Sequence, residues 1–316
     1  VKLSNNSWFN FFLNKLSLNT WIDFETEIAK VLDDLSVMFE ESFQRKGGFN
    51  YYQKDLINVY TDFRPFKFVK SDKEIVEIDS KFWVIGENRL KELEIFKILN
   101  DDLNGFTYIF NEYLQKIVVP FLNVPNQVFL NVYNQFERVF TFNYTSTIST
   151  IYNYPNEKIS YLHGKSDSIN FNIVLGVSDI NEKLKRLKLF NIAKYYQKII
   201  NGCNSSFLSK VNSKTIKEQI IFYVFGHSLD YSDKVYVQEL FDFVSQEKRL
   251  NSKIIIFYLD DIDKESKLNN ILSIINNEKI IELYRDKRLD FMIINEENLK
   301  KIKSEKLYRQ PGLTLH

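Results

Sequence analysis

The sequence has only one cysteine, Cys203, and it contains no uninterrupted apolar stretch of about 18 residues. A single cysteine cannot form an internal disulfide or a metal site with several thiolates. The lack of disulfides is typical of proteins in a reducing compartment. No transmembrane helix is expected, and the polar N-terminal residues do not resemble a secretory signal. We therefore expect a cytoplasmic protein with no membrane partner and no bound metal.

An excess of charge of one sign is also missing, because 42 Lys and Arg side chains balance 41 Asp and Glu side chains and leave a net charge of +1. Such a chain has no overall positive field that would attract nucleic acid, so we do not expect a nucleic-acid partner. The chain has 316 residues, of which 44% are hydrophobic, and this is enough for one large domain or two modest ones.

The first third of the chain has helical patterns. Apolar side chains recur every three or four positions between residues 20 and 35, which predicts a helix with one buried side. A second helix is expected over residues 90–117, in which Asn104-Gly105 could form an interruption. Between these helices, residues 75–85 are expected to form a short strand or two.

After Pro120 and Pro125, short apolar runs alternate with helical patterns, which indicates βαβ units. We expect strands near residues 139–142, 159–162, 173–175, 220–225, 254–259 and 291–294, and helices over 184–200, 234–246 and 264–275. The predicted domains are a mainly helical part, residues 1–125, packed on or inserted into the core, and an α/β core, residues 126–316.

Three of the expected strands are followed at once by polar residues or glycines: Asn143, the pair His163-Gly164 and the triplet Gly226-His227-Ser228. In an open α/β sheet, ligands bind outside the carboxyl ends of the strands, where loops and helix N-termini supply donors. We therefore expect these residues at a binding edge of the sheet.

Each of these residues has both a functional and a structural interpretation. The chain has three histidines, and the imidazole of His163 suits proton transfer near neutral pH, so His163 is the candidate general base. Asn143 can orient a water or a sugar hydroxyl, and Gly226 lets a ligand approach the backbone. Alternatively, Asn143 caps a turn, His163 is a hydrogen-bonded core residue and Gly226 only ends a strand.

Three segments together resemble a known family. Thr141-Phe-Asn-Tyr-Thr145, Leu162-His-Gly164 and Gly226-His-Ser-Leu-Asp230, in this order and after a helical segment with Trp21-Ile-Asp-Phe-Glu25, are similar to the AbiH family of bacteriophage abortive-infection proteins. That family is distantly similar to sirtuin-like NAD-binding domains, which carry a Thr-x-Asn segment, a His-Gly pair and a later Gly-x-Ser loop.

The resemblance implies a Rossmann-like, sirtuin-like α/β fold with a mostly parallel sheet and a largely helical N-terminal part. Sirtuin-like domains begin with a strand and a glycine-rich phosphate loop, and no such segment precedes Trp8. We therefore expect that first strand to be missing from the sheet.

The resemblance also implies roles for individual residues. Asn143 would position water or the nicotinamide ribose, and His163 would activate a hydroxyl or water. The dinucleotide NAD, as substrate or ligand, would be bound by Thr141, Gly164, Gly226, His227, Ser228 and Asp230. The implied reaction is cleavage of the nicotinamide N-glycosidic bond, and NAD depletion in an infected cell would abort the infection.

Two other functions stay open. The protein could be a non-catalytic nucleotide sensor or adaptor whose helical part recognises a phage protein or a host partner as its trigger. It could also be a nuclease that binds Mg²⁺ through the carboxylates of Leu259-Asp-Asp-Ile-Asp-Lys264. No Glu-x-Lys strand accompanies these carboxylates, which favours a solvated turn. A homo-oligomer is compatible with each function.

Overall fold

A computed structural model describes most of the chain. The described residues are 5–16, 23–44, 63, 66–69, 75–87, 89–122, 129, 132–203, 207–208, 220–246 and 252–307. The chain forms two compact units, which we call unit 1 and unit 2. Unit 1 consists of Val1–Phe121, Asn143–Thr145 and His163–Cys203, and unit 2 consists of Leu122–Phe142, Ser146–Leu162 and Asn204–His316. Each unit is described by itself.

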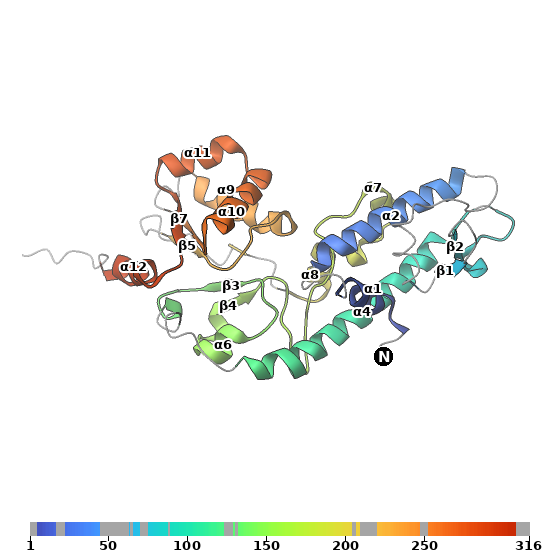
Figure 1. Ribbon diagram of the computed structural model, residues 1–316, viewed down its shortest axis with the longest axis horizontal. Helices are drawn as coiled ribbons and strands as arrows, with labels where there is room; N and C mark the ends of the chain where they lie inside the picture. Colours follow the sequence, from blue (N-terminus) through green and yellow to red (C-terminus); the bar gives the residue numbers. More distant parts are fainter. Residues whose placement is uncertain are drawn as a thin grey trace, which may run out of the picture. The chain divides into compact units, whose positions relative to one another are not determined.

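Helices dominate unit 1 (Figure 1). Its main helices are α1 (Ser7–Leu16), α2 (Phe24–Gln44) and α4 (Glu92–Tyr113), and they share an aromatic-rich core. In that core the Trp8 indole N–H donates to the carbonyl of Leu99, 2.9 Å away, and the Ser7 hydroxyl donates to the Asp102 carboxylate. Buried polar groups on α1 thus find partners on α4, which fixes the contact between the two helices.

The end of α4 departs from regular α-helix. It continues into a π-helical turn, η3 (Leu114–Val118), and then into a 3-10 turn, η4 (Val119–Phe121). Pro120 has no backbone N–H, so it cannot donate the next α-helical hydrogen bond. The α-helical hydrogen-bond pattern therefore cannot continue through Pro120, which lies in the 3-10 turn η4.

Shorter elements complete unit 1. An antiparallel pair consists of β1 (Phe66–Val69) and β2 (Ile75–Ile78), and β2 is followed by the 3-10 turn η2 (Ser80–Phe82). Further along the chain, α7 (Glu182–Arg186), the 3-10 turn η6 (Phe190–Ile192) and α8 (Lys194–Ile200) pack on the same core through Leu184, Ile192 and Tyr196.

A three-stranded parallel sheet is the centre of unit 2. Its strands β5 (Ile221–Val224), β6 (Lys253–Tyr258) and β7 (Leu289–Ile293) lie in that order. Helix α9 (Lys234–Ser245) connects β5 to β6, and α10 (Asp261–Ile274) with α11 (Asn277–Arg285) connects β6 to β7. The last helix, α12 (Glu296–Leu307), follows β7. This alternation of parallel strands and helices is the βαβ arrangement (Figure 1).

The central strand β6 is buried on both faces. Ile254 and Ile256 pack with α9 and α10 residues such as Phe241 and Ile271. Ile255 and Phe257 pack on the opposite face with another cluster, which includes residues of α12. Successive side chains of a strand point to opposite faces, so a strand covered on both sides has a continuous apolar run.

A second parallel pair of strands lies in unit 2. Strands β3 (Val139–Thr141) and β4 (Ile159–Tyr161) pair parallel, with each β3 residue opposite the residue 20 positions later. Helix α6 (Thr147–Tyr152) and the 3-10 turn η5 (Asn156–Lys158) lie between them in the sequence. Between α6 and η5, the Tyr154 hydroxyl donates to the carbonyl of Phe136, 3.1 Å away, which holds this connection against the segment before β3.

Most of the predicted elements are confirmed. Strands expected near residues 139–142, 159–162, 220–225, 254–259 and 291–294 are β3 to β7, and helices expected over 234–246 and 264–275 are α9 and α10. The α/β class with parallel strands is confirmed by β3–β4 and β5–β6–β7. A Rossmann-like, sirtuin-like fold, with or without its first strand, stays a prediction, as does a domain boundary at residue 125.

Three sequence-based predictions are wrong. Helix α4 runs through Asn104-Gly105 without interruption, and residues 184–200 form α7, η6 and α8 instead of one helix. Lys188, just after α7, has a φ of 57°, which no α-helix can continue. Residues 173–175 form no strand. They are apolar because they are buried, and the backbone of Leu175 bonds to the Gln197 side-chain amide instead of a neighbouring strand.

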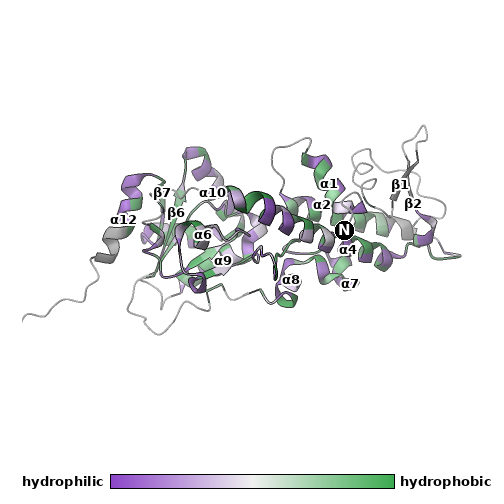
Figure 2. Cartoon of the chain, turned by 90° about the horizontal axis from the view of Figure 1, so that it is seen from below, coloured by the Kyte–Doolittle hydropathy of each residue, from purple (hydrophilic) through white to green (hydrophobic). Residues whose placement is uncertain are grey.

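Polar and apolar residues alternate around the helices of both units, visible as purple and green segments in Figure 2. This is the pattern of helices with one side in a core and the other in water. Within the described part of the chain, no helix is both long and apolar enough to cross a membrane.

Candidate functional site

The chain segments that follow β3 and β4 run beside each other. The Leu162 N–H donates to the carbonyl of Thr141 at 2.8 Å, which continues the pairing of the two strands. In unit 1 the Ser166 N–H donates to the carbonyl of Tyr144, also at 2.8 Å. The centroids of the Tyr144 and His163 rings are 6.3 Å apart. Asn143 and His163 are separated by the same 20 positions that the β3–β4 register joins, so each lies two residues after a paired strand end.

The two candidate catalytic side chains differ in their access to solvent. Asn143 is exposed, whereas His163 is 5% exposed and the neighbouring Thr141 is buried as well. The carbonyl of His163 accepts a hydrogen bond from the Val174 N–H at 2.9 Å, which holds this backbone in place. A ligand that arrives from solvent therefore reaches the Asn143 amide more readily than the His163 imidazole.

Gly164 is the position where glycine is required by the structure. Its φ is +80°, and a Cβ built on it would lie 2.0 Å from the carbonyl oxygen of Asn172. Around it, the Lys165 N–H donates to the Asn172 side chain at 2.7 Å, and the Asn172 N–H donates to the carbonyl of Lys165 at 3.1 Å. The segment after His163 therefore folds back tightly on residues 172–174. Any side chain at position 164 would push these two segments of the loop apart.

Helix α4 and its π-helical turn hold the same loop from another side. The side chain of Asn111 pairs with the backbone of Asp167 through two hydrogen bonds, at 3.0 and 3.1 Å. One turn later, Gln115 donates to the Ser166 hydroxyl at 2.7 Å. Asn111 and Ser166 are both buried. The loop that carries His163 is thus attached to α4 at the point where that helix becomes π-helical, a feature frequent at functional sites.

The loop after β5 belongs to unit 2. Gly226 has a φ of +58° and nothing lies within 4 Å of a Cβ built on it, so its backbone faces open space. Nδ1 of His227 accepts a hydrogen bond from the Leu229 N–H at 2.8 Å, and Nε2 lies 3.2 Å from an oxygen of Asp233. Ser228 is exposed. The loop therefore presents a glycine backbone and a hydroxyl to solvent while the imidazole faces inward.

Asp230 has a helix-capping role in this loop. Its carboxylate accepts from the Ser232 N–H at 3.1 Å, at the start of the 3-10 turn η7 (Tyr231–Asp233), which leads directly into α9. The ligand role that the resemblance implies for Asp230 stays a prediction. Capping by Asp230 accounts for its position.

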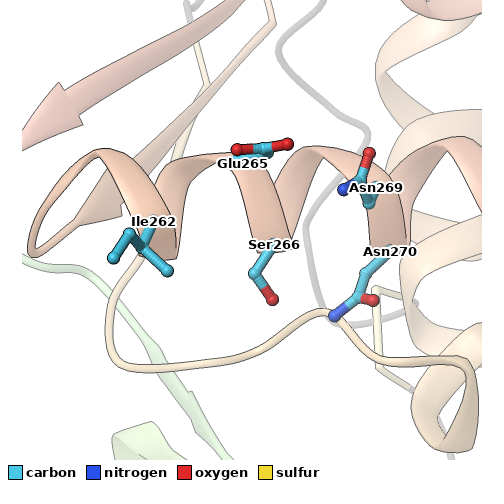
Figure 3. A pocket seen from close by; sticks show the side chains of 5 residues that line it. All are labelled: Ile262, Glu265, Ser266, Asn269 and Asn270. Atoms are coloured by element: carbon cyan, nitrogen blue, oxygen red, sulfur yellow. The ribbon is translucent and has the colours of Figure 1, made fainter.

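A shallow depression of about 410 Å³ lies on one side of α10, close to the same loop (Figure 3). The Asn270 amide points toward the loop and donates to the carbonyl of Ser228 at 2.9 Å. The side chains that line the depression come from successive turns of α10: Ile262, Glu265, Ser266, Asn269 and Asn270. Hydroxyl, amide and carboxylate groups thus lie beside the loop that contains Gly226.

Two of the carboxylates after β6 that are considered above as Mg²⁺ ligands, Asp260 and Asp263, have structural partners. Asp260 caps α10 by accepting from the Asp263 N–H at 2.8 Å. Asp263 accepts from the Leu259 N–H and pairs with the buried ammonium of Lys267. Partial burial raises the pKa of Asp263, but the hydrogen bonds from Lys267 and Leu259 outweigh it and lower the pKa overall. Among the described residues, no group of three or more His, Cys, Asp or Glu side chains could hold a metal ion.

The predicted site residues fall into two groups. Asn143, His163 and Gly164 belong to unit 1, and Thr141 and the loop from Gly226 to Asp230 belong to unit 2. Their roles toward a ligand stay predictions. Sequence reasoning missed the residues that hold the His163 loop: Asn111, Gln115 and Asn172. Polar residues within an amphipathic helix are normally solvated, and Asn111 lies 56 positions from its partner, so no local signal identifies it.

Comparisons with known proteins give one family. A family model described as "Bacteriophage abortive infection AbiH" matches residues 2–258. The chain is also 21% identical over 331 residues to "Dynein heavy chain-like protein 2" of Plasmodium falciparum (isolate 3D7), a match that covers 95% of this chain but 6% of that protein. At this identity and share of length, the likeness carries no argument about function. No solved structure matches the chain.

Proposed function

Because the chain belongs to the AbiH family of bacteriophage abortive-infection proteins, we propose that it defends cells against phage through a nucleotide site at the carboxyl ends of β3 and β4. At this site NAD is hydrolysed between nicotinamide and ribose. The matched residues 2–258 include both candidate catalytic residues and the loop after β5. The family suggests the role in abortive infection, and the reaction is our proposal.

One observation carries the proposal: an exposed asparagine and a histidine each lie two residues after one of two paired parallel strands, and the loop that carries the histidine is held by α4. In the proposed reaction, Asn143 orients a water molecule at the ribose carbon, and His163 takes a proton from that water. The electrons of the broken C–N bond leave with nicotinamide. Groups held in advance around the developing oxocarbenium charge lower the barrier, because they need no reorganisation during the reaction.

The loop of unit 2 supports the proposal in a different way. Gly226 exposes its backbone and Ser228 exposes its hydroxyl, which are the groups that ribose and phosphate oxygens bind in other nucleotide sites. Asn270 fixes the backbone of this loop through its hydrogen bond to Ser228. Taken by itself, this loop is therefore a candidate for binding ribose or phosphate oxygens.

The proposal is tested by incubating the purified full chain with NAD and measuring nicotinamide release. Replacing His163 or Asn143 with Ala is expected to lower the rate by about 10²-fold or more, as for loss of a positioned general base. The matched control is Glu157→Ala, an exposed residue just before the opposite end of β4, which should keep the rate. Because His163 is buried, His163→Gln is measured in parallel as a variant that keeps a polar side chain there.

Nicotinamide release that is unchanged in both the Asn143 and His163 variants would contradict the assigned roles. The same variants are then tested in cells challenged with phage, where loss of NAD hydrolysis should restore phage plaque formation. Plaque counts that stay low although hydrolysis is lost would separate defence from the reaction.

A second candidate function is a non-catalytic nucleotide sensor, and the burial of His163 favours it. A general base must reach the proton that it removes, and His163 is 5% exposed. A sensor would raise its melting temperature when NAD is added but release no nicotinamide. Thermal stabilisation by NAD without release of nicotinamide would therefore favour the sensor function over NAD hydrolysis.

A further inference from the structure

We propose that His227 is a positioning residue, whose neutral imidazole holds the turn from Gly226 to Asp230 in shape through both of its ring nitrogens. The inference rests on the proposed function in so far as this turn is assigned to the ligand. It assigns His227 a different task from its neighbours Gly226 and Ser228, which face solvent.

The hydrogen bonds of the ring determine its protonation state. Nδ1 accepts from the Leu229 N–H at 2.8 Å, so it carries no proton. The single proton of a neutral imidazole is then on Nε2, which lies 3.2 Å from the Asp233 carboxylate. A carboxylate beside an imidazole N–H is a common way to fix one tautomer.

The ring is also enclosed. Its side chain and that of Asp233 are each 13% exposed, and its centroid is 4.1 Å from that of the Phe142 ring. With both nitrogens occupied and one face covered, the imidazole has little to offer a ligand directly. Its contacts all go to the turn, to the start of α9 and to the end of β3.

The turn itself needs support. Leu229 has a φ of +57°, a backbone conformation that residues other than glycine rarely adopt. Its side chain is buried in the core beside α9. The His227 ring bonds to the N–H of this same residue. The bond from position 227 to the N–H two residues later has the geometry of an Asx turn, with imidazole Nδ1 in the place of an asparagine oxygen.

This geometry supplies a matched pair of variants. In His227→Asn the side-chain oxygen can still accept from the Leu229 N–H, but nothing reaches Asp233. In His227→Gln the amide NH₂ can still reach Asp233, but no short acceptor remains for Leu229. The two variants are similar in polarity and differ in which of the two contacts they keep.

The experiment measures the imidazole nitrogens of the full chain by two-bond ¹H–¹⁵N NMR, and hydrogen exchange of the Leu229 amide. We expect the Nε2–H tautomer for His227. Protection of the Leu229 amide should stay close to the original in His227→Asn and fall roughly fivefold or more in His227→Gln, the effect of one lost hydrogen bond. The buried amide of Ile256 in β6 is the control for general loss of stability.

An Nδ1–H tautomer, or equal loss of protection in both variants while Ile256 keeps its protection, would overturn the inference. If either variant also lowers protection at Ile256, the test is the tautomer of His227 in the unmodified protein. The Nε2–H tautomer then supports the inference and the Nδ1–H tautomer overturns it. Neither readout involves NAD. A protein with the expected tautomer that releases no nicotinamide would therefore keep the inference and lose the proposed reaction.

Discussion

Replacing Gly164 with Ala tests the account of the loop that carries His163. The new methyl group would lie 2.0 Å from the carbonyl oxygen of Asn172, and the backbone would have to keep a φ of +80°. That carbonyl cannot move freely, because the Cys203 thiol donates to it at 3.1 Å and the Lys165 N–H bonds to the side chain of the same asparagine. The substitution therefore combines a backbone penalty with a steric one.

The matched control is Gly202→Ala, because Gly202 also belongs to unit 1 and has a φ of +63°, but nothing lies within 4 Å of its Cβ position. The left-handed conformation costs each variant about 1–2 kcal/mol. Overpacking adds about 1–3 kcal/mol for Gly164→Ala alone. We therefore expect Gly164→Ala to lose about 2–5 kcal/mol of unfolding free energy and Gly202→Ala only the smaller part.

The assay is urea unfolding followed by tryptophan fluorescence. All three tryptophans, Trp8, Trp21 and Trp83, belong to unit 1, so the signal reports on the unit that contains both glycines. Equal unfolding midpoints for the two variants would refute the close approach of Asn172 to Gly164.

Three further predictions follow from individual contacts. Asn111→Leu removes both hydrogen bonds to the Asp167 backbone, so the unfolding free energy of unit 1 should fall by about 1–3 kcal/mol. A loss under about 0.5 kcal/mol in the same urea assay would contradict the role of this side chain. Burial raises the pKa of the Cys203 thiol, so iodoacetamide at pH 8 should label this thiol slowly until urea unfolds unit 1. Rapid labelling of the folded protein would be evidence against the burial of Cys203. Burial raises the pKa of Tyr154 from 10.0 to about 12, so the neutral phenol stabilises the fold below pH 10 and this stabilisation disappears as the pH rises to about 12. Stability of Tyr154→Phe measured over the same range should fall less steeply, and identical pH profiles would contradict the shift.

The strands of unit 2 were predictable because burial on both faces leaves a distinctive sequence. Ile254 to Phe257 form an unbroken apolar run, and each side chain packs on one of two cores. The same rule fails for residues 173–175, which are equally buried. There the Gln197 side chain bonds to the Leu175 backbone and the carbonyl of His163 accepts from Val174, and no pattern within the run distinguishes the two cases.

The candidate site was predictable where it depends on strand ends. Asn143 and His163 could be placed because each follows a recognisable strand at a similar distance. The support of the His163 loop could not be predicted, since Asn111 contacts Asp167 across 56 positions. The inward orientation of His227 also depends on Asp233 and on the φ of Leu229, neither of which has a sequence signature.

In the proposed function, Asn143 and His163 meet a nucleotide at the ends of β3 and β4. It is tested most directly by titrating the ¹⁵N-labelled full chain with a non-hydrolysable NAD analogue and following these two residues by NMR. We expect saturable shifts of the Asn143 side-chain amide and the His163 imidazole, with smaller changes at Glu157. Shifts confined to other parts of the chain, or none at saturating analogue, would contradict it.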